Sequence, residues 1–329
     1  MASSKVSINK VLFALLKVLV AVVSIWFIYS RITQRENFET FLAFVQQKFS
    51  EGDALPAMLG VAVLVFINYG LEAFKWKQLI SNLEPLSLLK SMQAVFLGTT
   101  ISFFTPNRVG EFAGRILFLK SQVRIQAVLS TFVGSLSQLL VTIVFGLLSA
   151  SLMAKYFFDL SSAMQAFLVP ASTVLIVLLL LLYPRINHLF SLPLLASLRL
   201  RFRDYLIAFE SYTKRELWNV FLLSLLRYFI FTGQYILLLQ FCDVSVQGWV
   251  MVALISIIFL IQSVVPTIAF AELAFRGSLA VLVFQKFTDN ITGIVAASFG
   301  LWFFNLALPA IIGSVMFLYL KWKNKNIQA

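Results

Sequence analysis

Long apolar stretches dominate this chain of 329 residues. A helix needs about 20 mostly apolar residues to cross a lipid bilayer. Stretches of that length occupy residues 11–30, 55–74, 127–153, 163–183, 217–241 and 291–320. Charged residues make up only 12% of the chain, about half of what a soluble domain carries. The weak period-two alternation argues against a β-barrel. The sequence therefore predicts an all-α polytopic membrane helical bundle with about six full spans, forming a single integral membrane domain over residues 1–329.

We attribute the net charge of +12 to basic residues that orient the chain in the membrane, and not to a nucleic-acid partner. Lys and Arg flank the apolar stretches, as the positive-inside rule requires. One cysteine and one histidine, Cys242 and His188, leave neither an internal disulfide nor a Cys/His metal cluster. The first stretch is long, contains Lys17 and lacks a small-residue cleavage site, so we expect a retained helix rather than a signal peptide. We expect no cofactor and no metal.

Two further apolar regions are interrupted in the middle. Residues 94–105 and 109–119 flank Pro106, and residues 249–265 and 271–287 flank Pro266. Proline removes an amide donor and forces its predecessor out of the helical conformation. Each region is therefore either one kinked span or a re-entrant pair of half-helices. The residues expected at the breaks are Thr105, Pro106, Asn107, Gly110 and Pro266.

The distribution of basic residues favours the re-entrant alternative. With both regions as hairpins, the cytoplasmic side receives Lys5, Lys10, Lys75, Lys77, Lys90, Lys120, Arg124, Arg185, Arg199, Arg201, Arg203, Lys214, Arg215, Lys321, Lys323 and Lys325. The other side receives Arg31, Arg35, Lys48, Lys155 and Lys286. With two kinked spans this bias disappears, although it normally sets topology. We expect both termini to be cytoplasmic, with Arg199, Arg201 and Arg203 on anionic inner-leaflet lipids.

The two interrupted regions resemble each other. After Pro106 come Glu111 and then Arg115, and after Pro266 come Glu272 and Arg276, with one extra residue in between. Matching interruptions in two halves are typical of transporters built from inverted repeats. We expect half-repeats at about residues 55–153 and 214–320.

Six ionisable residues in these membrane regions are candidates for binding a substrate: Arg108, Glu111, Arg115, Arg227, Glu272 and Arg276. A charge at the bilayer centre costs roughly 2.5–3.5 kcal/mol on insertion scales, so it needs a partner or an aqueous cavity. Each Glu–Arg pair is spaced i,i+4 and lies on one helical face. Such pairs either neutralise each other for structural reasons or line a cavity for a charged group.

Three further features favour a cavity. Arg108 lies at the start of a half-helix, where free amides attract anions. Arg227 stands in an apolar span and needs a distant partner, for which Glu272, Glu111 or a lipid phosphate are candidates. Irregular backbone at membrane depth is tolerated only inside protein or against water. Polar residues that could extend such a cavity are Asn68, Gln138, Gln234, Gln262 and Asn305.

Enzymatic function finds little support in the motifs. The chain contains no Walker A sequence, nucleophile elbow or zinc-protease motif. Glu111 and Glu272 could in principle act as acid and base, but each has a basic neighbour that keeps it ionised. We therefore expect no catalytic residues and no enzymatic activity.

The stretch from Phe104 to Arg115 resembles the lysylphosphatidylglycerol synthase transmembrane-region family, the flippase-like half of the bacterial multiple peptide resistance factor. The shared positions are Pro106, Arg108, Gly110, Glu111 and Arg115. A second block is similar at Pro266 and Glu272, but Ile268, Ala269 and Phe270 replace the usual glycines. The resemblance implies a multi-pass protein of the bacterial cytoplasmic membrane that moves polar lipids between leaflets. The synthase domain of that family's best-known member is absent, so aminoacyl transfer is not implied.

The leading hypothesis is a lipid flippase whose substrate is a membrane phospholipid or another polar lipid. Two other classes stay open on the sequence: a membrane subunit that scaffolds a lipid- or glycan-modifying enzyme, and an intramembrane transferase with a lipid-linked donor. The sequence leaves open whether the chain forms a homo-oligomer or joins a partner enzyme.

Overall fold

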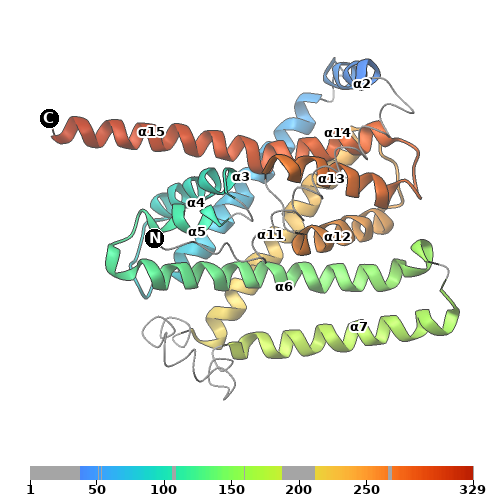
Figure 1. Cartoon of the computed structure of the whole chain (residues 1–329), viewed down its shortest axis with the longest axis horizontal. Coiled ribbons are helices and arrows are strands. Elements are labelled where there is room, and N and C mark those ends of the chain that lie inside the picture. The colour runs from blue at the N-terminus through green and yellow to red at the C-terminus, as the bar shows by residue number, and fades with distance from the viewer. Residues whose placement is uncertain are drawn as a thin grey trace, which may run out of the picture.

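The computed structural model describes residues 38–50, 52, 54–105, 109–158, 160–186, 212–265 and 269–328. The first predicted span, residues 11–30, lies outside the described residues. So do Pro106, Asn107, Arg108 and Pro266, and the basic group Arg199, Arg201 and Arg203. The described residues form helices and turns without a strand (Figure 1).

Five helical stretches are long and apolar enough to cross a membrane. They coincide with five of the predicted spans, and the predicted all-α polytopic bundle is confirmed. The stretches are α3 (Ala54–Leu79), α6 (Arg124–Phe157) after the short 3-10 turn η2 (Ser121–Val123), α7 (Ser162–Leu182) continued by η3 (Tyr183–Arg185), α11 (Lys214–Phe241), and the run α14 (Ile291–Trp302), η5 (Phe303–Ala307) and α15 (Leu308–Gln328). The helix α2 (Phe38–Ser50) precedes them.

Both interrupted regions form two shorter helices each. The first hairpin consists of α4 (Leu88–Phe103) and α5 (Gly110–Ile116), and the second consists of α12 (Gly248–Val264) and α13 (Ala269–Phe284). The breaks fall where the prolines predict them. The Ser87 hydroxyl caps the start of α4 by accepting a hydrogen bond from the Lys90 amide.

The first hairpin starts and ends at one face of the bundle. At its base the Lys120 amide donates a 2.9 Å hydrogen bond to a Glu84 carboxylate oxygen. Glu84 follows the end of α3, and Lys120 precedes the start of α6. Further in, α5 lies directly on α4, because a Cβ atom added to Gly114 would come within 2.5 Å of the Gly98 Cα atom. The chain therefore enters and returns on the same side.

The second hairpin starts and ends at the opposite face. The Asn290 side chain beyond α13 hydrogen-bonds the main chain of Cys242, which directly follows α11. The Lys286 ammonium donates to the carbonyl oxygen of Tyr156, 3.1 Å away at the far end of α6. Because α6 starts near the first hairpin's base and ends near the second, the two hairpins enter from opposite faces. Both regions are hairpins rather than kinked spans.

The order of elements is the same in both parts of the bundle. A span, a hairpin and a second span follow one another as α3, α4–α5 and α6, and again as α11, α12–α13 and α14–α15 (Figure 1). This order agrees with an inverted repeat; the half-repeat boundaries stay a prediction.

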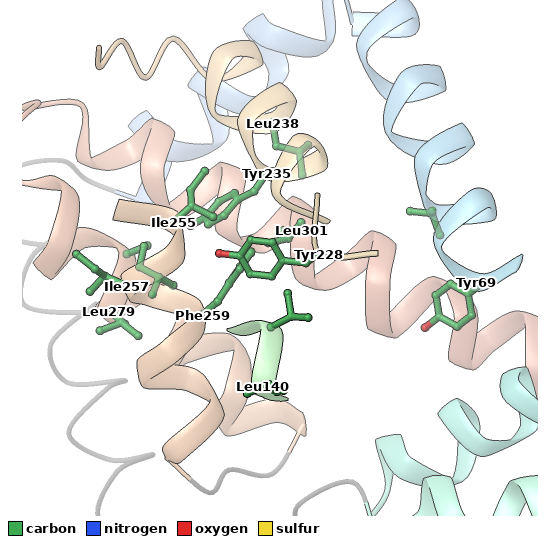
Figure 2. Packing of buried hydrophobic residues seen from close by; sticks show 14 of the residues in the cluster. Tyr69, Leu140, Tyr228, Tyr235, Leu238, Ile255, Ile257, Phe259, Leu279 and Leu301 are labelled. Atoms are coloured by element: carbon green, nitrogen blue, oxygen red, sulfur yellow. The ribbon is translucent and has the colours of Figure 1, made fainter. Parts of the chain in front are cut away.

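The apolar core lies where α11 meets α12 and the last span. Tyr228 and Tyr235 project from α11 onto Phe259 of α12, with ring centroids 6.0 and 6.2 Å apart (Figure 2). Their hydroxyl groups hydrogen-bond the side chains of Ser256 and Ser298. The buried hydroxyls are thus satisfied by neighbouring helices, which fixes the rotation of α11 against them.

The helix α7 lies at the side of the bundle, next to α6 (Figure 1). Only 11% of the residues in its most apolar 18-residue stretch are buried inside the protein. Most of its exposed side chains, such as Val174, Val177 and Leu178, are apolar. We assign this surface to lipid contact.

Candidate functional site

A cavity of about 670 Å³ lies between the two hairpins and the spans that surround them. Thr105 from the tip of the first hairpin and Val265 from the tip of the second both line it. The tips of hairpins from opposite faces thus reach one internal space. Its polar lining consists of Asn68, Tyr69, Glu72, Lys75, Thr99, Ser102, Thr105, Glu111, Arg115, Ser135, Gln138, Thr142, Arg227, Tyr228, Gln262, Ser263, Glu272, Arg276, Trp302 and Asn305.

Glu72 is the centre of the charged lining. It lies on α3 and is only 7% exposed. Its carboxylate contacts the Lys75 ammonium at 2.8 Å and Nη2 of Arg115 at 2.7 Å. It also accepts a hydrogen bond from Arg227, so one carboxylate contacts three cations from three elements. A buried charge needs such partners, because desolvation of an unpaired one is costly.

Two of the three cations, Lys75 and Arg115, are almost completely buried. Lys75 is 1% exposed, and its ammonium also approaches the Gly134 carbonyl oxygen at 3.4 Å and the Ser224 hydroxyl at 3.5 Å. Arg115 reaches Glu72 from α5 and also pairs with Glu111 one turn earlier. Lys75 is therefore part of the packed interior.

Arg227 is the cation with most access to the cavity, with 20% of its side chain exposed. Besides Glu72, it donates to the Asn68 side-chain oxygen at 2.9 Å and to the Gln138 side-chain oxygen at 3.3 Å. The sequence pointed to Glu272, Glu111 or a lipid phosphate as its partner. The observed protein partner is Glu72, which that reasoning missed.

A second ion pair lines the cavity from the other hairpin. On α13 the Nε atom of Arg276 donates a 2.9 Å hydrogen bond to a Glu272 carboxylate oxygen. The two residues are spaced i,i+4, as predicted. Each hairpin thus carries one Glu–Arg pair near its tip, and both pairs face the same space.

The described lining has a small excess of positive charge. Its cations are Lys75, Arg115, Arg227 and Arg276, and its carboxylates are Glu72, Glu111 and Glu272, which leaves one positive charge uncompensated (4 − 3 = 1). An uncompensated positive charge attracts a nearby negative charge strongly in a medium of low dielectric constant. The excess favours an anionic group as the occupant of the cavity.

The tip of the first hairpin is held by Thr105 and Gly110. The Thr105 hydroxyl accepts a 2.8 Å hydrogen bond from the Gly110 amide and donates to the Ser102 carbonyl oxygen at 3.3 Å. A Cβ atom on Gly110 would lie 2.6 Å from the main chain of Ile101. Only glycine allows this approach. Both residues contribute to the break, and the other predicted break residues lie outside the described part of the chain.

Among the predicted site residues, the structure brings Glu111, Arg115, Arg227, Glu272 and Arg276 together around one cavity. Their role in substrate binding stays a prediction. Of the predicted polar residues, Asn68, Gln138, Gln262 and Asn305 also line the cavity. Gln234 does not belong to the lining. It is fully buried on α11, and neither amide atom has a partner in the described structure.

Two residues of the site were not identified from the sequence. Glu72 was taken as part of the apolar stretch 55–74, and Lys75 was counted among the basic residues on the cytoplasmic side without a role in the site. The structure buries Lys75 on Glu72 instead of exposing it at a face of the bundle. The i,i+3 spacing of a carboxylate and an ammonium next to Asn68 in one span was the available signal.

The chemistry of the lining is that of ion and hydrogen-bond recognition. Among the described residues there is no group of three His, Cys, Asp or Glu side chains that could hold a metal ion. The carboxylates Glu72, Glu111 and Glu272 each contact an arginine. Paired in this way, they suit reversible exchange of partners with a charged ligand.

The chain matches one known protein family over most of its length. The family model described as "Lysylphosphatidylglycerol synthase TM region" matches residues 14–271, well over half of the chain. The match includes Glu72, Lys75, Glu111, Arg115 and Arg227, and it ends directly before Glu272. No curated protein matches the chain.

Proposed function

The chain belongs to the lysylphosphatidylglycerol synthase TM region family of lipid-handling membrane proteins, and we propose that it moves a polar or charged lipid between the two leaflets. The head group passes through the charged cavity, while the acyl chains stay in the bilayer. A volume of about 670 Å³ lies within the usual range for pockets that bind one small-molecule ligand, which is also the size class of a lipid head group.

One observation carries this proposal. Two hairpins that enter from opposite faces place their tips at the same ion-paired cavity. A site at the meeting point of two such elements is the arrangement used by transporters with inverted repeats. A movement of either hairpin would open the cavity toward the face from which that hairpin enters.

The ion pairs supply a mechanism for binding and release. Without substrate, Glu72 and Glu111 neutralise Arg115 and Arg227. An entering anionic group exchanges with a carboxylate as partner of a guanidinium, so the number of charge contacts stays nearly constant. This lowers the desolvation cost of taking a head group out of water. No bond-breaking step is assigned to the cavity.

Lipid exchange in proteoliposomes tests the proposal. The purified protein is reconstituted with fluorescently labelled phospholipids, and dithionite quenching reports how much label reaches the inner leaflet. We expect Glu111→Ala and Arg115→Ala to abolish exchange while the protein stays folded. Arg185→Ala is the matched control, because this exposed arginine on η3 lies outside the cavity. Exchange at the rate of protein-free liposomes, or unimpaired exchange by both cavity variants, would contradict the proposal.

From the positive-inside rule we propose that the base of the first hairpin lies on the cytoplasmic side of a bacterial cytoplasmic membrane. Ten described Lys and Arg residues lie at that face and three at the other (Figure 1). They are Lys77, Lys90, Lys120, Arg124, Arg185, Lys214, Arg215, Lys321, Lys323 and Lys325 against Lys48, Lys155 and Lys286. An impermeant thiol reagent added to intact cells should label Ser50→Cys and spare Ser81→Cys. The reverse pattern would invert the orientation.

A further inference from the structure

The last span is interrupted beside the cavity. Its first part, α14, passes into the π-helical turn η5, and Pro309 is the second residue of α15. Proline has no amide group, so Pro309 gives no α-helical hydrogen bond to the carbonyl oxygen of Asn305, four residues earlier. Tyr69 projects from α3 toward this span, and its hydroxyl donates to that oxygen instead, at 2.9 Å (Figure 2). Prolines and π-helical turns are the usual places where helices kink, and both occur here.

The part of the span after this turn is attached to the first hairpin, since α15 packs on α4 (Figure 1). The Thr100 hydroxyl of α4 donates to the Ala310 carbonyl oxygen at 3.0 Å. A Cβ atom on Gly313 would lie 2.3 Å from the Thr100 hydroxyl oxygen and 2.6 Å from the Phe96 carbonyl oxygen, so the two helices are in close contact. Because α5 also lies directly on α4, the helices α4, α5 and α15 form one packed unit.

The part of the span before the turn is attached to α11, where the hydroxyl groups of Tyr235 and Ser298 lie 2.7 Å apart. The second hairpin packs on a different span. A Cβ atom on Gly146 of α6 would lie 2.4 Å from the Leu260 Cβ atom of α12. At this contact α6 is one continuous α-helix. The two hairpins therefore differ: the second packs on a continuous span, and the first packs on a span that is interrupted beside the cavity.

Tyr69 connects the interruption to the first hairpin. Besides its hydrogen bond to Asn305, its ring is stacked on Phe96 of α4, with the centroids 5.0 Å apart and the planes at 6°. One turn further along α3, Glu72 binds Arg115 of α5 at 2.7 Å. Both contacts hold the first hairpin against α3. An entering anionic group that takes over Arg115 removes the second of them.

We propose that the last span is hinged at residues 305–309, that the first hairpin moves with α15 about this hinge, and that Tyr69 stabilises the observed arrangement. Tyr69 is thus a positioning residue that acts through Asn305 and Phe96. Release of Arg115 from Glu72 frees the unit of α4, α5 and α15, and the cavity opens toward the face from which the first hairpin enters. This inference rests on the proposed function, since it names the hairpin that moves and the point about which it moves.

Removing the proline tests the hinge by lipid exchange in liposomes of phosphatidylethanolamine and phosphatidylglycerol. Pro309→Ala restores the missing amide group and favours a straight helix. We expect exchange about tenfold slower than in the native protein, because proline is the least favourable residue inside a helix and its removal stabilises the straight arrangement. Pro170→Ala is the matched control, since Pro170 also lies inside a spanning helix, but in α7 at the side of the bundle. That variant should exchange lipid at the native rate.

Distances between spin labels report the movement itself. In a Cys242→Ala background, labels at Leu226→Cys on α11 and Val315→Cys on α15 lie on the two sides of the hinge, at exposed positions. Leu226→Cys with Leu178→Cys on α7 is the control pair, because both sites lie outside the moving unit. In nanodiscs of the same two lipids, we expect two distances for the pair across the hinge and one for the control pair.

Two variants should shift these distances in opposite directions. Pro309→Ala should leave only the distance that corresponds to the observed arrangement. Tyr69→Phe keeps the ring on Phe96 and loses only the hydrogen-bond donor to Asn305, so it should enrich the other distance. A merely structural role of the two residues would not produce opposite shifts.

The outcomes separate this inference from the proposed function. A single distance that neither variant changes would overturn the hinge and leave lipid transport in place. Exchange at the native rate in Pro309→Ala, or equal slowing in Pro170→Ala, would overturn the part of the hinge in transport. If the native protein exchanges no lipid, the proposed function fails and the spin labels decide alone: opposite shifts support the hinge, and their absence overturns it.

Discussion

The side-chain amide of Asn290 donates a 2.9 Å hydrogen bond to the main-chain carbonyl oxygen of Cys242, 48 residues earlier in the chain. This contact closes the second hairpin at its base. The same side chain accepts a hydrogen bond from the Gly293 amide at 2.8 Å and so caps the start of α14. One residue thus joins the end of one span, the hairpin and the start of the next span.

Replacing Asn290 should remove two separate contributions to the stability of the bundle, the helix cap and the contact that closes the hairpin. Asn290→Ala removes the cap and the closing contact, and we expect the free energy of unfolding to fall by about 1–3 kcal/mol. Asn290→Asp retains the capping oxygen and loses only the donor, so its loss should be smaller. Denaturant unfolding in detergent micelles measures both. No loss in Asn290→Asp would show that closure of the base contributes nothing, and equal losses for the two variants would show the same of the cap.

The contact between α4 and α5 depends on two glycines. Gly114→Ala would place a methyl group against the Gly98 main chain, and we expect a loss of about 1–3 kcal/mol in stability together with slower lipid exchange. Gly233→Ala on α11 is the matched control, because apart from the adjoining residues and backbone of α11 itself the described structure has no atom within 4 Å of its added methyl group. That variant should be neutral or more stable by up to about 1 kcal/mol. Similar thermal shifts for both would argue against close packing of the first hairpin.

The Glu72–Arg227 contact should show strong coupling. Glu72→Gln leaves three cations without their shared carboxylate, and we expect a loss of about 3–5 kcal/mol. Arg227→Gln should cost less, since Glu72 keeps Lys75 and Arg115. The double variant should lose less stability than the sum of the two single losses, by about 0.5–3 kcal/mol. Glu72→Gln combined with Arg276→Gln serves as the control and should be additive, because Arg276 pairs with Glu272.

Thiol labelling of an introduced cysteine can show whether the cavity contains water, provided that the native Cys242 does not react. Burial raises the pKa of Cys242 to about 12, and the neighbouring Asp243 adds to this effect. Near pH 8 the thiolate fraction is then about 10⁻⁴, so the native cysteine should resist labelling until the protein unfolds. Thr142→Cys in the cavity should react with a charged methanethiosulfonate reagent, and Leu178→Cys on the lipid-facing side of α7 should not. An unreactive Thr142→Cys would mean a dry or closed space.

Replacing a buried side-chain amide that has no hydrogen-bond partner by an apolar side chain should stabilise the protein. Both polar atoms of the Gln234 side chain are unpaired in the described structure, so Gln234→Leu should raise the free energy of unfolding by about 1–2 kcal/mol. Gln138→Leu is the contrasting variant, since Gln138 bonds Arg227 and the Ser224 carbonyl oxygen. It should lower stability. A loss of stability or of exchange in Gln234→Leu would reveal a role that the resting structure does not explain.

The sequence predicts those features of this protein that depend on local chemistry. Hydrophobic length locates the spans, and the prolines locate the breaks of both hairpins. The i,i+4 spacing also identifies the Glu111–Arg115 and Glu272–Arg276 pairs before any tertiary structure is known. These predictions succeed because each depends on neighbours within one helical turn.

Features that depend on packing between distant segments were not predictable in the same way. Glu72 meets Arg227 across 155 residues and Arg115 across 43 residues. Nothing in the local pattern says which helix faces α3 at that height. The burial of Lys75 was missed for a related reason: a lysine near the end of an apolar stretch looks like a surface anchor unless its buried partner is known. The contact of Gly98 with Gly114 also becomes visible only once α5 is seen to fold back on α4.

Each hairpin is anchored at one face only, and the two anchors lie on opposite sides of the bundle. The separation of the two tips is thereby coupled to the thickness of the surrounding hydrocarbon layer. We expect longer acyl chains to draw the anchors apart and widen the gap between the tips, and shorter chains to press the tips together. Membrane composition would in this way tune the passage, without any ligand acting on the protein.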